Sequence, residues 1–131
     1  MMQIGLVALG SAVGGLTRWG VGLLAARYLG TRFPYGTLLI NVTGCLFLGW
    51  FATFLSQRLV VPPTWWLQAE DLWLMIGVGF TGAYTTFSTF GYESDTLLRR
   101  GDPLLATIYV LASVLVGLIA VRCGVLLACS E

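Results

Sequence analysis

Apolar residues occur along this chain in four long segments, separated by short polar or turn-forming stretches. The segments cover residues 4–28, 36–56, 72–98 and 103–127. A helix needs about 20 mostly apolar residues to cross about 30 Å of hydrocarbon, because each residue advances about 1.5 Å. The pattern therefore predicts an all-helical integral membrane protein with four transmembrane helices in a single domain, residues 1–131.

The composition agrees with a membrane location. Hydrophobic residues make up 57% of the chain and charged residues only 10%, whereas a soluble domain of this length needs more polar surface. The first ten residues contain no basic residue, so we expect no cleaved signal peptide and a multi-pass protein of the cell inner (plasma) membrane. The net charge of +1 gives no reason to expect nucleic acid as a partner.

Few residues suit catalysis or metal coordination by side chains. The chain has no histidine, which removes the commonest general base and the commonest transition-metal ligand. Cys45, Cys123 and Cys129 lack metal-ligand spacing, and we expect them to pack as small apolar helix residues. We also expect no paired carboxylates embedded at membrane depth. We therefore expect that the protein is not an enzyme.

Residues 80–94, FTGAYTTFSTFGYES, interrupt the apolar pattern of the third segment. Hydroxyl side chains compete with the helical backbone for hydrogen bonds, and Gly82 precedes most of them. Two interpretations are open: a continuous helix with a hydroxyl-rich packing face, or a broken transmembrane helix. Non-helical backbone persists at membrane depth only where it is buried in protein, lines a cavity or binds an ion. Freed carbonyl oxygens would suit a hard cation such as Na⁺.

Polar residues also lie within the first two segments. Arg18 either reaches an interface or helix-end carbonyls, or it lines a wet vestibule that attracts anions. Thr37, Asn41 and Gly44 are spaced by four and three residues, so they share one helix face. The Asn41 amide can bind a neighbouring helix, and its NH₂ group can also donate to an anion.

Two further patterns complete the candidate chemistry. Tyr109, Ser113 and Gly117 recur every four residues in the last segment, and the first two make a short hydroxyl track or an ordinary interhelical contact. Phe87 and Phe90 share a helix face, and a phenyl edge is electropositive because the negative density of the ring lies on its faces. Ring edges with neutral donors suit a small anion that must lose its water, and do not suit a cation.

Three stretches resemble the signatures of the Fluc (CrcB) family of fluoride channels. They are GGLTR at 14–18, PYGTLLINVTGC at 34–45 and GFTGAYTTFSTFGYE at 79–93, in order along nearly the whole chain. The resemblance implies an antiparallel, dual-topology homodimer of four-helix subunits with a broken third helix and two fluoride pathways. It also implies a structural Na⁺ at the dimer centre, held by backbone carbonyls.

Carried over to this chain, the family pattern implies particular site residues. The fluoride pathway is expected to contain Arg18, Thr37, Asn41, Phe87, Ser88, Phe90, Glu93, Tyr109 and Ser113. The Na⁺ is expected to be bound by the carbonyls of Gly82 and Thr85. There are two departures from the pattern: Ala83 stands where many members have a second glycine, and Gly117 where many have a hydroxyl residue.

The charges and aromatic residues between the segments bear on orientation. One side carries Arg27, Arg32, Arg99 and Arg100, and the other carries Arg58 and Arg122. This weak bias fits either noise or a chain that inserts both ways round. Trp65, Trp66 and Trp73 flank the third segment, as interfacial anchors do.

These observations favour a passive, fluoride-selective channel that exports cytoplasmic fluoride and relieves its toxicity. One alternative is a small four-helix drug–proton exporter, but that mechanism needs an embedded carboxylate, typically in the first helix, where this chain has Arg18. The other alternative is a non-transporting membrane assembly protein, which would not need the insert of hydroxyl and phenyl side chains.

Overall fold

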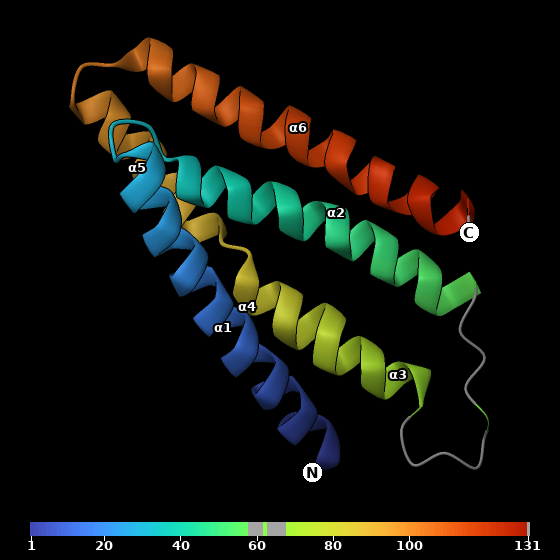
Figure 1. Ribbon diagram of the computed structural model, residues 1–131. Helices are drawn as coiled ribbons and strands as arrows, with labels where there is room; N and C mark the ends of the chain where they lie inside the picture. Colours follow the sequence, from blue (N-terminus) through green and yellow to red (C-terminus); the bar gives the residue numbers. More distant parts are fainter. Residues whose placement is uncertain (58–61, 63–67, 131) are drawn as a thin grey trace.

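The computed structural model describes residues 1–57, 62 and 68–130, and every element in these ranges is a helix (Figure 1). The elements are α1 (Met2–Leu29), α2 (Tyr35–Gln57), α3 (Ala69–Leu72), the π-helix η1 (Trp73–Thr81), α4 (Gly82–Tyr84), α5 (Phe87–Arg99) and α6 (Pro103–Ser130). The expected all-helical class is confirmed for the part of the chain that the structure describes. Among these elements α1, α2 and α6 are long and apolar enough to cross a membrane.

Glycine and proline set the ends of the long helices. α1 ends at Gly30, whose φ of 79° lies in the left-handed region that glycine adopts most readily. Gly101, with φ 80°, follows α5 in the same way. Pro34 directly precedes α2, and Pro103 is the first residue of α6, where its missing N–H costs nothing.

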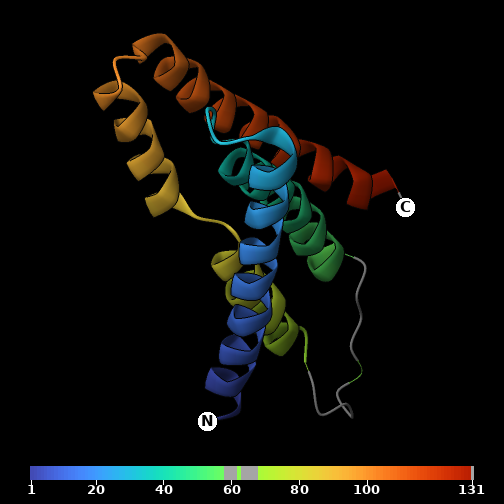
Figure 2. The same ribbon diagram turned by 60° about the vertical axis from the view of Figure 1, so that its left-hand side comes forward.

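Residues 68–102 are divided into four helical pieces. Gln68 and Asp71 cap the start of α3, and the Asp71 carboxylate accepts from the Gln68 N–H at 3.0 Å. η1 and α4 follow without a gap, and then Thr85 and Thr86 adopt extended conformations, with ψ of 161° and 119°. Figure 2 shows α5 displaced sideways from α4 by this extended link.

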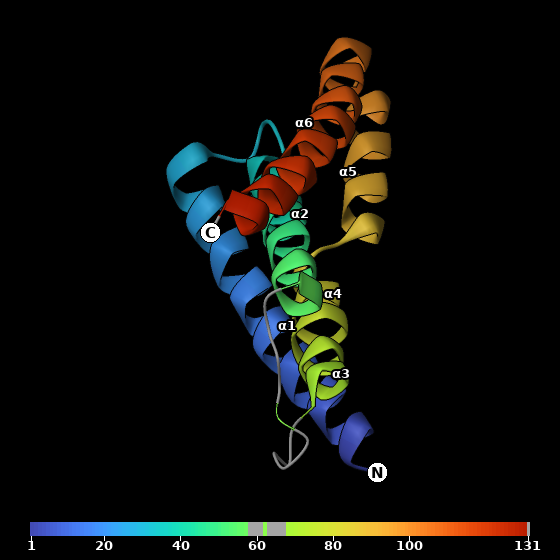
Figure 3. The same ribbon diagram turned by 90° about the vertical axis from the view of Figure 1, so that its right-hand side faces the viewer.

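α1 and the interrupted segment α3–α5 run in one direction, and α2 and α6 run in the opposite direction (Figures 1 and 3). α2 packs along α6, and α1 packs along η1 and α4. Glycines make both contacts close: a Cβ atom at Gly124 would collide with the Leu46 carbonyl oxygen, and one at Gly14 with that of Phe80. Small residues at helix contacts are the usual way to pack helices in lipid.

Not every residue singled out in the sequence lies in the part of the chain that the structure describes. Trp65, Trp66 and Arg58 fall outside the described residues. Trp73 stacks in parallel on Phe51, with ring centroids 6.5 Å apart. Large apolar side chains are exposed along α1 and α6, as expected for surfaces that face lipid or another protein.

Candidate functional site

The extended link between α4 and α5 is held by a side chain of α2. The Thr86 N–H donates to Asn41 Oδ1 at 2.8 Å, and Asn41 Nδ2 donates to the Thr86 carbonyl at 3.1 Å. Thr86 is buried, so both of its peptide groups need partners within the protein. Asn41 therefore makes the interhelical bond that the sequence left open, and its second amide N–H remains for another acceptor.

The same link leaves several carbonyl oxygens without their helical donors, including those of Gly82 and Thr85. In a continuous helix the Gly82 carbonyl would accept from the Thr86 N–H, which here donates to Asn41. The Thr85 carbonyl would accept from the Thr89 N–H, which here donates to the Thr86 hydroxyl at 3.3 Å. Gly82 and Thr85 border a cavity of about 320 Å³, called the smaller cavity below, together with Asn41.

α5 brings the two candidate phenyl rings together. The ring centroids of Phe87 and Phe90 are 5.7 Å apart at an interplanar angle of 48°. Phe87 is 82% exposed and borders the smaller cavity, whereas Phe90 packs against the buried Tyr109 at 5.3 Å. One ring thus faces the surface of the protein, and the other lies against the contact between α5 and α6. Ser88, between them, is exposed, and its hydroxyl lies 3.4 Å from that of Thr86.

Polar side chains of α6 meet α2 and α5. The Tyr109 hydroxyl, fully buried, donates to Glu93 Oε2 at 2.8 Å and lies next to the Thr37 hydroxyl. One turn further along α6, the buried Ser113 Oγ has no hydrogen-bond partner among the described residues. A Cβ atom at Gly117 would lie 3.6 Å from the Cys45 sulfur. A thiol therefore lies near the position where many family members have a hydroxyl residue.

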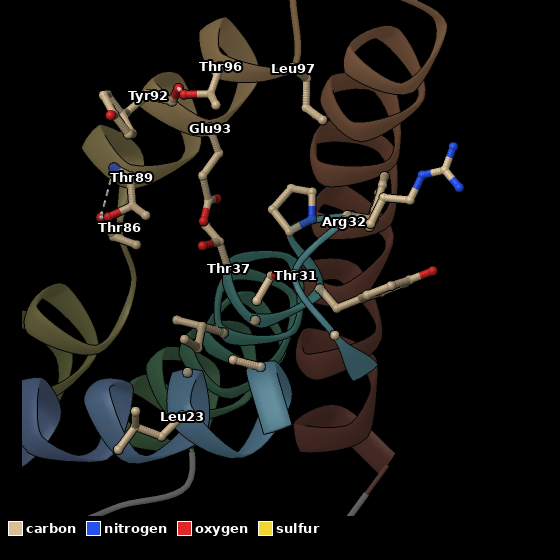
Figure 4. A pocket seen from close by; sticks show the side chains of 18 of the residues that line it. Leu23, Thr31, Arg32, Thr37, Thr86, Thr89, Tyr92, Glu93, Thr96 and Leu97 are labelled. Carbon is tan, nitrogen blue, oxygen red and sulfur yellow. Dashed lines mark hydrogen bonds between the residues drawn. The ribbon is translucent and has the colours of Figure 1, made fainter. Parts of the chain in front are cut away.

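A second cavity, called the larger cavity below, has a volume of about 510 Å³ and lies among α1, α2 and α5 (Figure 4). Its charged lining residues are Arg18, Arg32, Arg100 and Glu93. Three guanidinium groups and one carboxylate make its lining positive overall, which favours anions. Figure 4 shows the hydroxyl residues Thr37, Thr86 and Thr89 around the same space as Glu93.

Arg18 lies beside the larger cavity. The side chain is half-buried and lines the larger cavity, and within the described residues no carboxylate forms an ion pair with it. Its cation therefore borders a hollow in the protein. Arg32 and Arg100 border it too, although the sequence pattern indicated only a role in orientation for them. Arg32 lies in the connection between α1 and α2, and Arg100 directly follows α5, so their approach to the cavity depends on how these elements pack together.

The two cavities gather seven of the predicted site residues, whereas Ser88, Phe90, Tyr109 and Ser113 line neither of them. Arg18, Thr37 and Glu93 line the larger cavity, whereas Asn41, Gly82, Thr85 and Phe87 line the smaller one. Thr86 borders both cavities, which sequence reasoning did not single out. The described residues contain no cluster of three or more Cys, Asp or Glu side chains that could hold a metal ion.

The long apolar helices and the polar residues gathered around an interrupted segment define a small multi-pass membrane protein. The chain belongs to the CrcB family: the family described as CrcB-like protein, Camphor Resistance (CrcB), matches residues 5–125. The family resemblance of the three sequence stretches is thus confirmed, and with it a location in the plasma membrane.

Relatives of known name are similar over almost their full length. A protein of Chloroflexus aurantiacus is 47% identical over 125 residues, which is 95% of this chain and 94% of the relative. One of Acidobacterium capsulatum is 45% identical over 118 residues, covering 90% and 89% of the two chains. One of a Synechococcus species is 40% identical over 122 residues, covering 93% and 88%. Each is named fluoride-specific ion channel FluC, and ion channels are not enzymes.

Proposed function

We propose that this protein is a passive, fluoride-selective ion channel that exports cytoplasmic fluoride and so relieves its toxicity. The names of its relatives support the substrate. The observation that carries the proposal is the position of Thr86, which lies in the extended link between α4 and α5 and borders the larger cavity. A positively lined cavity meets an interrupted segment there, and neutral donors and phenyl rings follow on α5 and α6.

Neutral donors along this route suit a dehydrated anion. The second N–H of the Asn41 amide and the unpartnered Ser113 hydroxyl can each donate a hydrogen bond. The edges of Phe87 and Phe90 supply partial positive charge without a fixed cation, which would hold the ion too tightly for it to leave. Fluoride is the halide that accepts hydrogen bonds most strongly, so this donor set is compatible with the selectivity in the relatives' names.

Passive export is useful to a cell in acidic surroundings. Neutral HF crosses the bilayer and dissociates inside, and the anion is then trapped, because burying a bare charge costs tens of kcal/mol by Born estimates. A pore with donors removes that barrier, and a negative-inside potential drives the anion out at about 2.3 kcal/mol per 100 mV. Proton coupling would need an embedded group that titrates near neutral pH. The chain has no histidine to supply such a group.

We further propose that α3, η1, α4 and α5 together cross the membrane as one interrupted third helix, and that two antiparallel subunits form the working unit. The exposed Phe87 and Gly82 support this arrangement, because both lie on a surface that one subunit leaves uncovered. A two-fold axis through this surface would pair each smaller cavity with its copy.

The smaller cavity fits a structural Na⁺ at that axis. The carbonyls of Gly82 and Thr85 have lost their helical donors, and hard cations prefer oxygen ligands. Two carbonyls from each of two subunits would supply four ligands. When bound, the ion would add a fixed positive charge that holds the subunits together, and it need not move for fluoride to move.

Dual topology can be tested by biasing insertion. Adding three lysines to the connection near Arg32 should fix one orientation and lower fluoride transport when that variant is expressed alone. Transport should return when a variant with three lysines at the opposite end is co-expressed. Full activity from a demonstrably one-way population would contradict the antiparallel dimer.

The function itself is tested by flux from liposomes that contain the purified protein. Parallel assays with fluoride, chloride and a cationic dye separate the three candidate classes. A channel of this family should release fluoride alone, with chloride release near that of protein-free liposomes. Dye transport driven by a proton gradient would indicate a multidrug exporter, and no transport of any of the three would favour an assembly protein.

A further inference from the structure

A nine-residue π-helix, η1, leads directly into the interrupted segment. π-helices are rare and mostly a single turn long, and they frequently occur at functional sites. The last residue of η1 is Thr81, which is only 2% exposed and borders the smaller cavity. The backbone conformation at Thr81 therefore sets the direction in which the following residues, Gly82 to Thr85, point.

The Thr81 hydroxyl is bonded differently from the other helical threonines. It donates to the Ile76 carbonyl, five residues back, at 3.0 Å. The hydroxyls of Thr17, Thr53 and Thr107 each donate to the carbonyl four residues back, which is the usual bond in an α-helix. A step of five residues is that of the π-helix, so the Thr81 side chain reinforces the last π turn.

The carbonyl of the same residue anchors the far side of the junction. It accepts both the Thr85 N–H and the Thr85 hydroxyl, each at 3.0 Å. The Gly82 N–H turns back to the Gly79 carbonyl, which tightens the backbone where the π-helix ends. Thr81 thus connects the π turn on one side with Thr85 on the other.

We propose that Thr81 is a positioning residue, whose hydroxyl keeps the last turn of η1 in the π register and so directs the Gly82 and Thr85 carbonyls into the smaller cavity. This inference rests on the proposed Na⁺ site. If the last turn of η1 became α-helical, its backbone hydrogen bonds would join residues four apart instead of five apart. The residues after it would then rotate by about 100° about the helix axis. The two carbonyls would then no longer point into the same cavity.

The test measures Na⁺ affinity in Thr81→Val, which keeps the branched shape and removes the hydroxyl. The thermal unfolding midpoint of the purified full-length protein is followed against NaCl concentration, with choline chloride holding ionic strength constant. Ligand-linked stabilisation gives an apparent Kd. We expect this Kd to rise roughly 3- to 10-fold, which corresponds to the loss of one net hydrogen bond.

Two further variants separate positioning from packing. Thr81→Ser retains the hydroxyl and should keep the Na⁺ Kd within about twofold of wild type. Thr53→Val removes another buried threonine hydroxyl, whose bond to Gly49 stays inside one α-helix, and should leave the Kd unchanged. If the valine variant does not assemble, Thr81→Ala takes its place with the same expected rise.

The outcomes also distinguish this inference from the proposed function. A wild-type Kd in Thr81→Val or Thr81→Ala, or an equal rise in Thr81→Ser, would overturn the role of the hydroxyl while leaving the Na⁺ site standing. A wild-type protein whose stability does not respond to Na⁺ would overturn both the site and the inference. Fluoride flux in liposomes would still test the channel function separately.

Discussion

Replacing Asn41 by leucine should release the link between α4 and α5 from α2. The amide makes two hydrogen bonds to the Thr86 backbone, at 2.8 and 3.1 Å, and leucine can make neither. Thr86 is only 8% exposed, so its N–H and carbonyl would be left in an environment with little water.

The size of the effect follows from these two groups. A buried polar group that loses its partner costs about 1–3 kcal/mol, so two groups cost about 2–6 kcal/mol. The lower bound of about 2 kcal/mol corresponds to about a 30-fold shift in the equilibrium between the closed and the opened link. The Thr86 amide hydrogen should therefore exchange with solvent at least about 30 times faster than in wild type.

Hydrogen–deuterium exchange of the protein in detergent or nanodiscs measures this directly. Asn41→Asp is the matched variant, because its carboxylate can still accept from the Thr86 N–H. It loses only the donor to the Thr86 carbonyl, so exchange at Thr86 should fall between that of wild type and that of Asn41→Leu. It should also conduct fluoride poorly, since a negative charge beside the route repels the anion. Unchanged exchange at Thr86 in Asn41→Leu would refute the role of this clamp.

Other substitutions test separate contacts. Gly14→Ala should lower stability by about 1–3 kcal/mol, because its methyl group would collide with a carbonyl oxygen of η1. Gly15→Ala, with open space around it, should raise stability by up to about 1 kcal/mol. Equal effects of the two substitutions in denaturation experiments would contradict the packing of α1 on η1. Tyr109→Phe should cost about 1.5–3 kcal/mol by removing the donor to Glu93, and an unfolding midpoint like that of wild type would show that this bond contributes nothing. Phe90→Ile keeps an apolar side chain but removes the ring, so fluoride efflux from liposomes should fall sharply while the protein remains assembled. Wild-type efflux would rule out the ring edge as a fluoride contact.

The long helices could be predicted because their causes are local. An apolar stretch of sufficient length, ended by Gly30 or begun by Pro103, defines a helix without knowledge of its neighbours. The predicted first and last segments, 4–28 and 103–127, lie inside α1 and α6, which are each longer by a few residues. Such differences arise because the residues at helix ends carry little pattern.

The site could be predicted only in part, because its bonds join distant parts of the chain. The spacing of Phe87 and Phe90 placed them on one helix face, and they do lie in contact. The partner of Asn41 could not be deduced, since it is the backbone of a residue 45 positions away, in a conformation that this bond itself stabilises. Likewise, no pattern connects Glu93 with Tyr109, which meets it across the contact of α5 with α6.

The π-helix left no signal in the sequence at all. Its residues, WLMIGVGFT, are as apolar as those of an ordinary buried helix. Its register depends on packing against α1, where Gly10 and Gly14 allow the backbone of η1 to approach closely, and on the Thr81 hydroxyl. Hydrophobic periodicity indicates which residues share a helix face, but it does not indicate to which carbonyl each backbone N–H donates.

The central claim, a passive fluoride channel, is tested most directly by the reversal potential of the current in planar bilayers that contain the purified protein. With a tenfold fluoride gradient and no pH difference, the reversal potential should be about 59 mV. It should keep that value when a pH gradient is added in either direction, because no proton moves with the ion. A reversal potential that shifts with the pH gradient would show proton coupling and contradict the channel mechanism.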